Sequence, residues 1–160
     1  MQMNYLAIIV AAFIPIIVGS LWFNSKTFGT IWMREADVTF LKLRRRNVLV
    51  IFFITLLLSF LLAFFLQQLT IHQTGVVQLT GGDVAMAEPS YFAFMADYGS
   101  NFRTFQHGAL HGFLSGIFLF LPVITINGLF EAKSWKYIFL NSGYWTVTLT
   151  IMGAIICGWV

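Results

Sequence analysis

The sequence predicts an all-α, polytopic membrane protein that has four transmembrane helices and a small, partly helical outer loop. The chain is 59% hydrophobic and only 9% charged, whereas an ordinary soluble domain is about a quarter charged. Four long runs contain no Asp, Glu, Lys or Arg, and each can cross a hydrocarbon core about 30 Å thick as a helix. The runs are continuous and do not alternate with period two, so they favour helices over the strands of a barrel.

The expected helices cover residues 4–23, 48–66, 108–130 and 137–160 within a single membrane domain of residues 1–160. The first run lacks a basic segment ahead of it and a small-residue cleavage site before Trp22. We therefore interpret it as a retained helix and not as a signal peptide. Pro15 and Pro122 lie inside the first and third runs, and we expect a kink at each because proline removes a backbone hydrogen bond.

Positive charge is distributed unequally among the loops. Six of the nine basic residues lie in the first loop, residues 24–47, and two lie in the third, residues 131–136. The second loop, residues 67–107, contains only Arg103. Since cytoplasmic loops carry the excess of Lys and Arg, we expect the first and third loops in the cytoplasm. The second loop and both termini are then outside.

A basic cluster adjoins the inner end of the second run: Lys42, Arg44, Arg45 and Arg46. We interpret it as a topology anchor that also contacts anionic lipid headgroups. Docking of a protein or a nucleic acid is the alternative, but no basic segment is long enough to make a nucleic-acid module. Membrane lipids are therefore the expected partner, and nucleic acid is not.

The two longer loops differ in composition. In the first loop, Phe28, Ile31 and Trp32 are spaced like one face of an amphipathic turn on the membrane surface. In the outer loop, residues 70–84 predict short extended segments joined by a Gly-Gly turn. Residues 88–101 predict a short aromatic helix that begins near Pro89 and stops at Gly99.

The stretch HGALHGFLSG, residues 107–116, begins the third run and contains two of the three histidines. His107 and His111 share one face of a helix because they are four residues apart. Such a pair could bind a divalent metal ion if a third ligand came from the outer loop. Two alternatives stay open, namely simple hydrogen bonds to neighbouring segments, and a proton relay, pH sensor or cofactor site. The candidates for the third ligand, all on the expected outer side, are His72, Asp83, Glu88 and Asp97. Of these, His72 and Asp97 are preferred.

Two further sets of residues have the spacing of helix contacts. Gly108, Gly112 and Gly116 form a small-residue stripe beside the histidines, and such a stripe lets another helix approach closely. Asn127 and Asn141 lie seven residues before and after Ser134, the centre of the expected hairpin between the last two helices. We expect an amide hydrogen bond across that hairpin, with a polar substrate site as the alternative.

Several motifs resemble the bacterial family called domain of unknown function 1761. The matching stretches are GSLWFNSKTFGTIWM at 19–33, HGALHG at 107–112 and LFEAKSWKYIFLNSGYWTVTLTIMGAIICGW at 129–159. The most specific parts are Gly-x-x-Trp, Phe-Gly-x-x-Trp, the Phe-Glu turn and the Met-Gly pair of the last run. The resemblance implies a small integral protein of the bacterial inner membrane with this four-helix architecture. It implies neither an activity nor catalytic residues, and we expect the long outer loop to depart from the family.

These observations favour a non-enzymatic inner-membrane protein, either a structural or an accessory bundle. The glycine stripe leads us to expect self-association or docking on a larger membrane complex. The alternative is a metal- or cofactor-binding membrane protein that uses the histidine pair at its outer face. A third possibility is a solute channel, or an intramembrane enzyme that uses Ser115 beside His111. The absence of charge in the spans argues against an ion-coupled transporter, and the single Cys157 excludes an intrachain disulfide.

Overall fold

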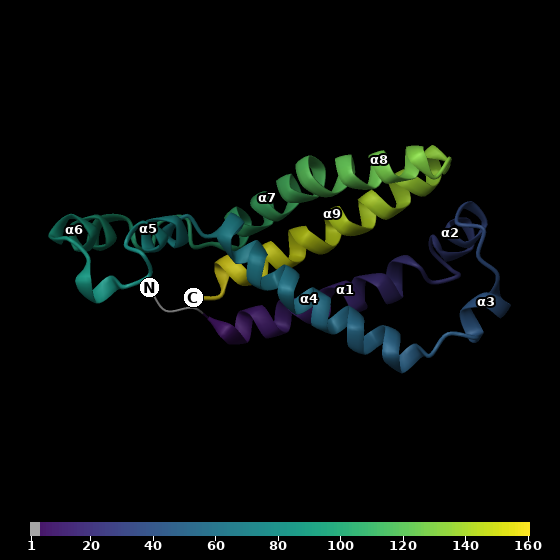
Figure 1. The fold of residues 1–160 in the computed structure, drawn as a ribbon, viewed down its shortest axis with the longest axis horizontal. Coiled ribbons are helices and arrows are strands. Elements are labelled where there is room, and N and C mark those ends of the chain that lie inside the picture. Colours follow the sequence, from purple (N-terminus) through teal and green to yellow (C-terminus); the bar gives the residue numbers. More distant parts are fainter. Residues whose placement is uncertain (1–3) are drawn as a thin grey trace.

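Residues 4–160 are described by a computed structural model, in which every regular element is helical and no strand occurs. Four helical spans are long and apolar enough to cross a membrane. These are α1 (Tyr5–Trp22), α4 (Val48–Thr70), the combined span Phe105–Phe130 and α9 (Trp135–Gly158). The all-α fold class and the four spans predicted from hydropathy are confirmed, and the chain is a multi-pass membrane protein (Figure 1).

Polar N-terminal caps define where the spans begin more sharply than hydropathy does. The side chains of Asn47, Thr104 and Ser134 accept hydrogen bonds from backbone amides in the first turns of α4, α7 and α9. Such caps satisfy amides that have no partner inside the helix. The third span therefore begins at Phe105, three residues before its apolar run. At its other end α4 continues to Thr70, four residues beyond its predicted end, with the amide of Ile71 still bonded to the carbonyl oxygen of Gln67.

The third span consists of three pieces. These are α7 (Phe105–Ser115), a wider π-helical turn η2 (Gly116–Phe120) and α8 (Leu121–Phe130). The wide turn lies directly before the first turn of α8, which contains Pro122. A proline lacks the N–H that would continue the regular ladder, and a single π turn absorbs such an interruption.

The glycine stripe packs against α9 of the same chain. Gly108 and Gly112 are buried, and a β-carbon at either position would overlap a backbone carbonyl of α9, that of Gly153 or Leu149. A β-carbon at Gly116 would lie 2.6 Å from the Cα of Thr146. The close approach expected of such a stripe thus occurs within the chain. Because this face is buried, it no longer supports the expectation of self-association.

α9 is the central helix, with α7 and α8 on one side and α1 and α4 on the other (Figure 1). Tyr144 in the middle of α9 donates a hydrogen bond of 2.8 Å from its hydroxyl to the carbonyl oxygen of Pro15 in α1. Towards the end of the bundle opposite α2 and α3, apolar side chains of α1, α4 and α9 form the core: Ile8, Ala11, Ala63, Leu66, Leu149, Met152 and Ile156.

One end of the bundle holds the two basic loops. The short helices α2 (Gly29–Glu35) and α3 (Phe40–Arg44) lie at the same end as the turn between α8 and α9 (Figure 1). Trp32 donates a hydrogen bond of 3.3 Å from its Nε1 to the Oδ1 of Asn141. The four side chains of the basic cluster are all exposed: Lys42, Arg44, Arg45 and Arg46.

Asn127 does not pair with Asn141 as the sequence led us to expect. The amide of Asn141 accepts from Trp32 and donates to the carbonyl oxygen of Tyr137, while the side chain of Asn127 is exposed. Among residues 4–160 no hydrogen bond joins the two asparagines. The similar depth of the two asparagines on the hairpin did not predict a contact, because residues at the same depth can face different neighbours around each helix.

The outer loop differs in part from its prediction. Residues 73–79 form α5 (Gln73–Leu79) where we expected extended segments, whereas the predicted aromatic helix is present as α6 (Pro89–Tyr98). The Gly-Gly turn is also present, since Gly81 and Gly82 have positive φ values of 68° and 83°. A strand needs a partner for its backbone groups, whereas a helix satisfies its own, and the β-branched residues of this segment meet no other strand in the described chain.

Candidate metal centre

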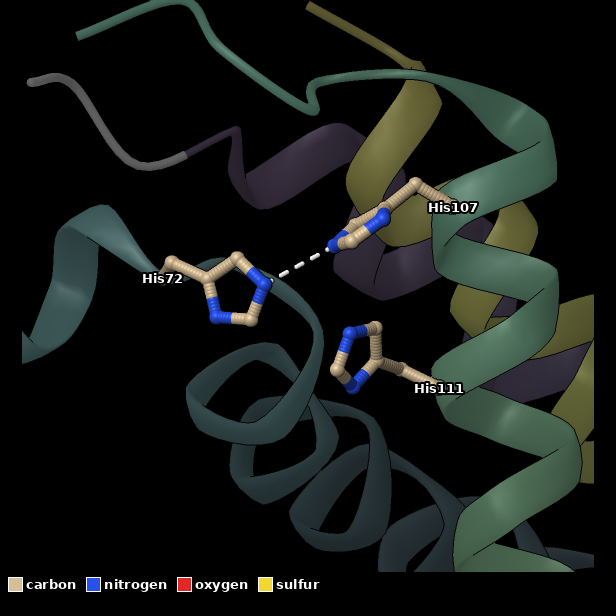
Figure 2. Close-up of side chains that lie close together, drawn as sticks. All are labelled: His72, His107 and His111. Atoms are coloured by element: carbon tan, nitrogen blue, oxygen red, sulfur yellow. Dashed lines mark hydrogen bonds between the residues drawn. The ribbon is translucent and has the colours of Figure 1, made fainter. Parts of the chain in front are cut away.

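The three histidines of the chain converge on one another, as Figure 2 shows, and the helices that carry them meet at the end of the bundle opposite α2 and α3 (Figure 1). His107 and His111 project from successive turns of α7, and His72 reaches them from the junction of α4 and α5. The ring centroids lie 5.0 Å apart for His72 and His107, 4.9 Å for His72 and His111, and 4.5 Å for His107 and His111. Residues separated by 35 positions in sequence thus form one cluster.

Packing and hydrogen bonds hold both sides of the cluster in position. On one side, α7 is fixed by its glycine face against α9 and by the cap that Thr104 provides to the amide of His107. On the other side, Ile71 is buried in the core at the end of α4. Gln73, directly after His72, donates from its Nε2 to the carbonyl oxygens of Tyr98 and Asn101, at 2.9 and 2.8 Å. His72 is thereby linked to both the bundle and α6.

The distances suit a shared metal ion. One ligand nitrogen from each ring can be chosen so that all three lie within 4.8 Å of one another. A tetrahedral ion with bonds of about 2.0–2.1 Å holds its nitrogen ligands roughly 3.3 Å apart. The Nε2 atoms of His72 and His107 are 2.9 Å apart. Without a metal ion, one of these nitrogens carries a proton and donates it in a hydrogen bond to the other; a bound ion would take the place of that proton. The cluster could hold a metal ion.

Three imidazoles without a carboxylate make a particular kind of site. The only cluster of metal-ligating side chains among residues 4–160 consists of these histidines. Neutral imidazole ligands leave a divalent ion with its full charge. A tetrahedral ion with three protein ligands also keeps a fourth position for water or another ligand.

Phe102 borders the cluster and has a strained backbone. Its ring centroid lies 5.0 Å from that of His107 and 6.2 Å from that of His72. Its φ of 62° lies in the left-handed region, which is an outlier for a bulky residue and costs about 1–3 kcal/mol. The thiol of Cys157 donates to the carbonyl oxygen of Phe102 at 3.3 Å, and Arg103 donates to the carbonyl oxygen of Cys157 at 3.0 Å. These hydrogen bonds to the end of α9 hold the strained turn at Phe102 in place. No pattern in the sequence predicted this turn.

A pocket of about 290 Å³ lies between α5 and α6, and His72 and Phe102 form part of its wall. The wall also contains Val76, Phe94 and Tyr98, so it is mainly apolar. Ligand-binding cavities in proteins are typically about 300–1,000 Å³. The pocket therefore has room for a small molecule directly beside a candidate metal ligand.

The other predicted site residues lie apart from this cluster. Of the candidate third ligands only His72 joins the pair; Asp97 is on the exposed surface of α6, and neither Asp83 nor Glu88 belongs to the cluster. Ser115 donates its hydroxyl to the carbonyl oxygen of His111 at 2.8 Å, which is a bond within its own helix and not a bond to the ring. The structure therefore gives no support to a serine–histidine dyad.

Comparison with known proteins places the chain in a family without assigning it a role. No curated protein and no solved structure matches the chain. A match to the family described as "Protein of unknown function (DUF1761)" extends over residues 6–157, and thus includes the outer loop that we expected to depart from the family. The match covers the first two motif stretches and the third up to residue 157, all four spans except the ends of the first and last, and all three histidines. The chain belongs to the DUF1761 family.

Proposed function

We propose that this protein binds a divalent transition metal ion through His72, His107 and His111 at the outer end of its membrane bundle. The observation that carries the proposal is the convergence of all three histidines of the chain from two separate segments. This favours the metal-binding alternative over the structural bundle that the sequence first suggested.

Hydrogen bonding alone accounts poorly for the arrangement. One bond joins His72 to His107, while the ring of His111 has no hydrogen-bond partner among the described residues. Ionisable side chains within a membrane-spanning segment are costly and are usually retained for a function, and His111 lies within the third span. A shared ion would use one nitrogen of each ring, that of His111 included.

The donor set indicates which metals are suitable. Imidazole nitrogens suit zinc, copper, iron and nickel, whereas calcium and magnesium prefer oxygen ligands. Three histidines with one position left open are typical of catalytic zinc sites. We therefore propose a zinc-like ion with an exchangeable fourth ligand, and this donor set is compatible with either a binding or a catalytic role.

Titration of the purified protein with Co²⁺ tests the proposal. Protein purified in detergent without a metal-affinity resin is expected to bind one Co²⁺ per chain, with the visible absorption of a tetrahedral site. The double variant His107→Ala/His111→Ala should lose this absorption. Gln106→Ala, an exposed position on the same helix, should keep it and serves as the control. A wild-type protein that binds no ion, or a double variant that binds equally well, contradicts the proposal.

We further propose that the metal centre faces the exterior of a bacterial inner membrane and that the basic end contacts anionic lipids in the cytoplasmic leaflet. The charge bias between the two ends supports this orientation. Cys157 is the only cysteine and is buried, so introduced cysteines can report orientation. A membrane-impermeant maleimide should label Ser100→Cys in intact cells but Arg45→Cys only after permeabilisation. The opposite pattern overturns the orientation.

A further inference from the structure

The geometry points to a small amphipathic anion as the ligand of this centre: its anionic oxygen takes the open metal position and its apolar part occupies the pocket between α5 and α6. The inference rests on the proposed function, because the anion needs a bound metal ion. It goes further by specifying the chemical class of the exogenous ligand and the surface that selects it.

The pocket and the cluster are joined through shared residues. His72 is a member of the histidine cluster and also a wall of the pocket. Phe102 lines the pocket as well, and its ring is next to both His72 and His107. A molecule in the pocket therefore lies against His72, one of the three proposed metal ligands.

Charge determines which head group the metal would prefer. Three neutral imidazoles leave the ion with two uncompensated positive charges, and the cluster contains no Asp or Glu. An anionic oxygen in the fourth position reduces that charge, and carboxylate oxygens are ordinary zinc ligands. Carboxylates and phosphate esters share this chemistry, so both belong to the inferred class.

The wall of the pocket determines what the other part of the ligand should be. Apart from His72, Gln73 and Asn101, its residues are Val76, Phe94, Tyr98 and Phe102. An apolar or aromatic body excludes water from this surface and gains free energy in proportion to the area that it covers. A bare inorganic anion can satisfy the metal but leaves the wall uncovered. The site should therefore distinguish an amphipathic anion from a simple one.

Two matched pairs of anions test the inference on Co²⁺-loaded protein, with the change in cobalt absorption as the measure of binding. The pairs are acetate with phenylacetate, and inorganic phosphate with phenyl phosphate. Burial of an aromatic group should make the aromatic member bind at least about tenfold more tightly. An advantage in only one pair identifies the preferred head group, and an advantage in either pair supports the inference.

A pocket-filling variant shows where the selectivity arises. Val76→Trp should remove the advantage of the aromatic anions while the protein still binds Co²⁺ and acetate. Leu79 is on the same helix but outside this wall, and it is 88% exposed. The variant Leu79→Trp should therefore keep the tighter binding of the aromatic anions.

Each outcome separates the two proposals. If the protein binds Co²⁺ but treats aromatic and simple anions alike, the inference is wrong and the metal site stands. If the advantage survives Val76→Trp, the apolar part lies elsewhere and the assignment to this pocket is wrong. If no Co²⁺ is bound, the proposed function and the inference both fail.

Discussion

The charged residues and the histidines lie towards the two ends of the bundle, and the two ends use them differently. At the basic end, the polar contacts tie loops to helices: Trp32 to Asn141, and Glu35 to Ser134 at 2.6 Å. The basic side chains there remain exposed. At the opposite end, His72, His107 and His111 face one another and adjoin a pocket. A cluster that converges on one point can bind a ligand, whereas dispersed surface charge mainly orients the chain in its membrane.

The largest difference between the ends should appear on metal addition. A ligand that binds only the closed state lowers the equilibrium population of the open state in proportion to its excess over the dissociation constant, so a 100-fold excess slows exchange about 100-fold. In hydrogen exchange with and without Zn²⁺, amides of α5 and early α7 should be protected, and those of α2 should not change.

His72→Ala provides the control for this comparison. It removes the ligand that links α5 to α7, so protection of α5 should disappear even if the remaining pair still binds weakly. Equal protection of α2 and α5, or protection of α5 that survives in His72→Ala, would contradict the proposed centre.

The next largest effect is on the free energy of unfolding when a glycine near either end of the bundle is replaced by alanine. In Gly108→Ala the new methyl group would overlap the backbone of α9 at Gly153, so we expect a loss of about 1–3 kcal/mol in the free energy of unfolding. In Gly19→Ala, near the basic end, the nearest atom would be the hydroxyl oxygen of Tyr144 at an ordinary 3.5 Å. That variant should be neutral, or more stable by up to about 1 kcal/mol from helix propensity.

Denaturant unfolding in detergent measures both glycine variants. If Gly19→Ala lost as much stability as Gly108→Ala, the close backbone contact between α7 and α9 would not be what distinguishes the two positions.

A smaller effect is expected for Trp32→Phe at the basic end. The change deletes the donor to Asn141 but keeps an aromatic ring, and a hydrogen bond contributes about 0.5–1.5 kcal/mol. Trp135→Phe is a suitable comparison, because Trp135 stacks on Phe139 and no described side chain accepts from its indole. The expected result is a loss for Trp32→Phe and little change for Trp135→Phe; equal losses would mean that the bond to Asn141 contributes nothing measurable.

The smallest effect is the pH dependence due to Glu35. Hydrogen bonds from Ser134 and Arg34 hold the pKa of this carboxyl group below its usual value. Its contribution to stability is therefore complete above the unfolded-state pKa and is lost as the pH falls through the lowered pKa. Because the carboxyl group is still partly exposed to solvent, we expect only a slight difference between wild type and Glu35→Gln, present at pH 7 and absent under strongly acidic conditions. A difference that grew on acidification would contradict this assignment.

Several features could be predicted from local sequence patterns. The four spans, the helix that begins at Pro89 and the Gly-Gly turn follow from apolar run length, proline position and glycine conformation, which act over a few residues. The extended segments expected for residues 70–84 were wrong, because β-branched residues favour a strand only where a partner strand exists. The bond between Asn127 and Asn141 failed for a related reason: the depth of a residue is local information, but the direction it faces depends on its neighbours.

By itself the sequence determined that the chain partitions into lipid as four helices, which end carries the positive charge, and that two histidines and three glycines lie on adjoining faces of one helix. Only the tertiary structure decided that His72 joins the pair while Asp97 does not, that the glycines contact α9 of the same chain, and that His72 belongs to both the cluster and the wall of a pocket. The physical reason is range. Hydrophobic run length and helical periodicity act within about 20 residues, whereas convergence of residues 72 and 107 depends on how α4, α7 and α9 pack together.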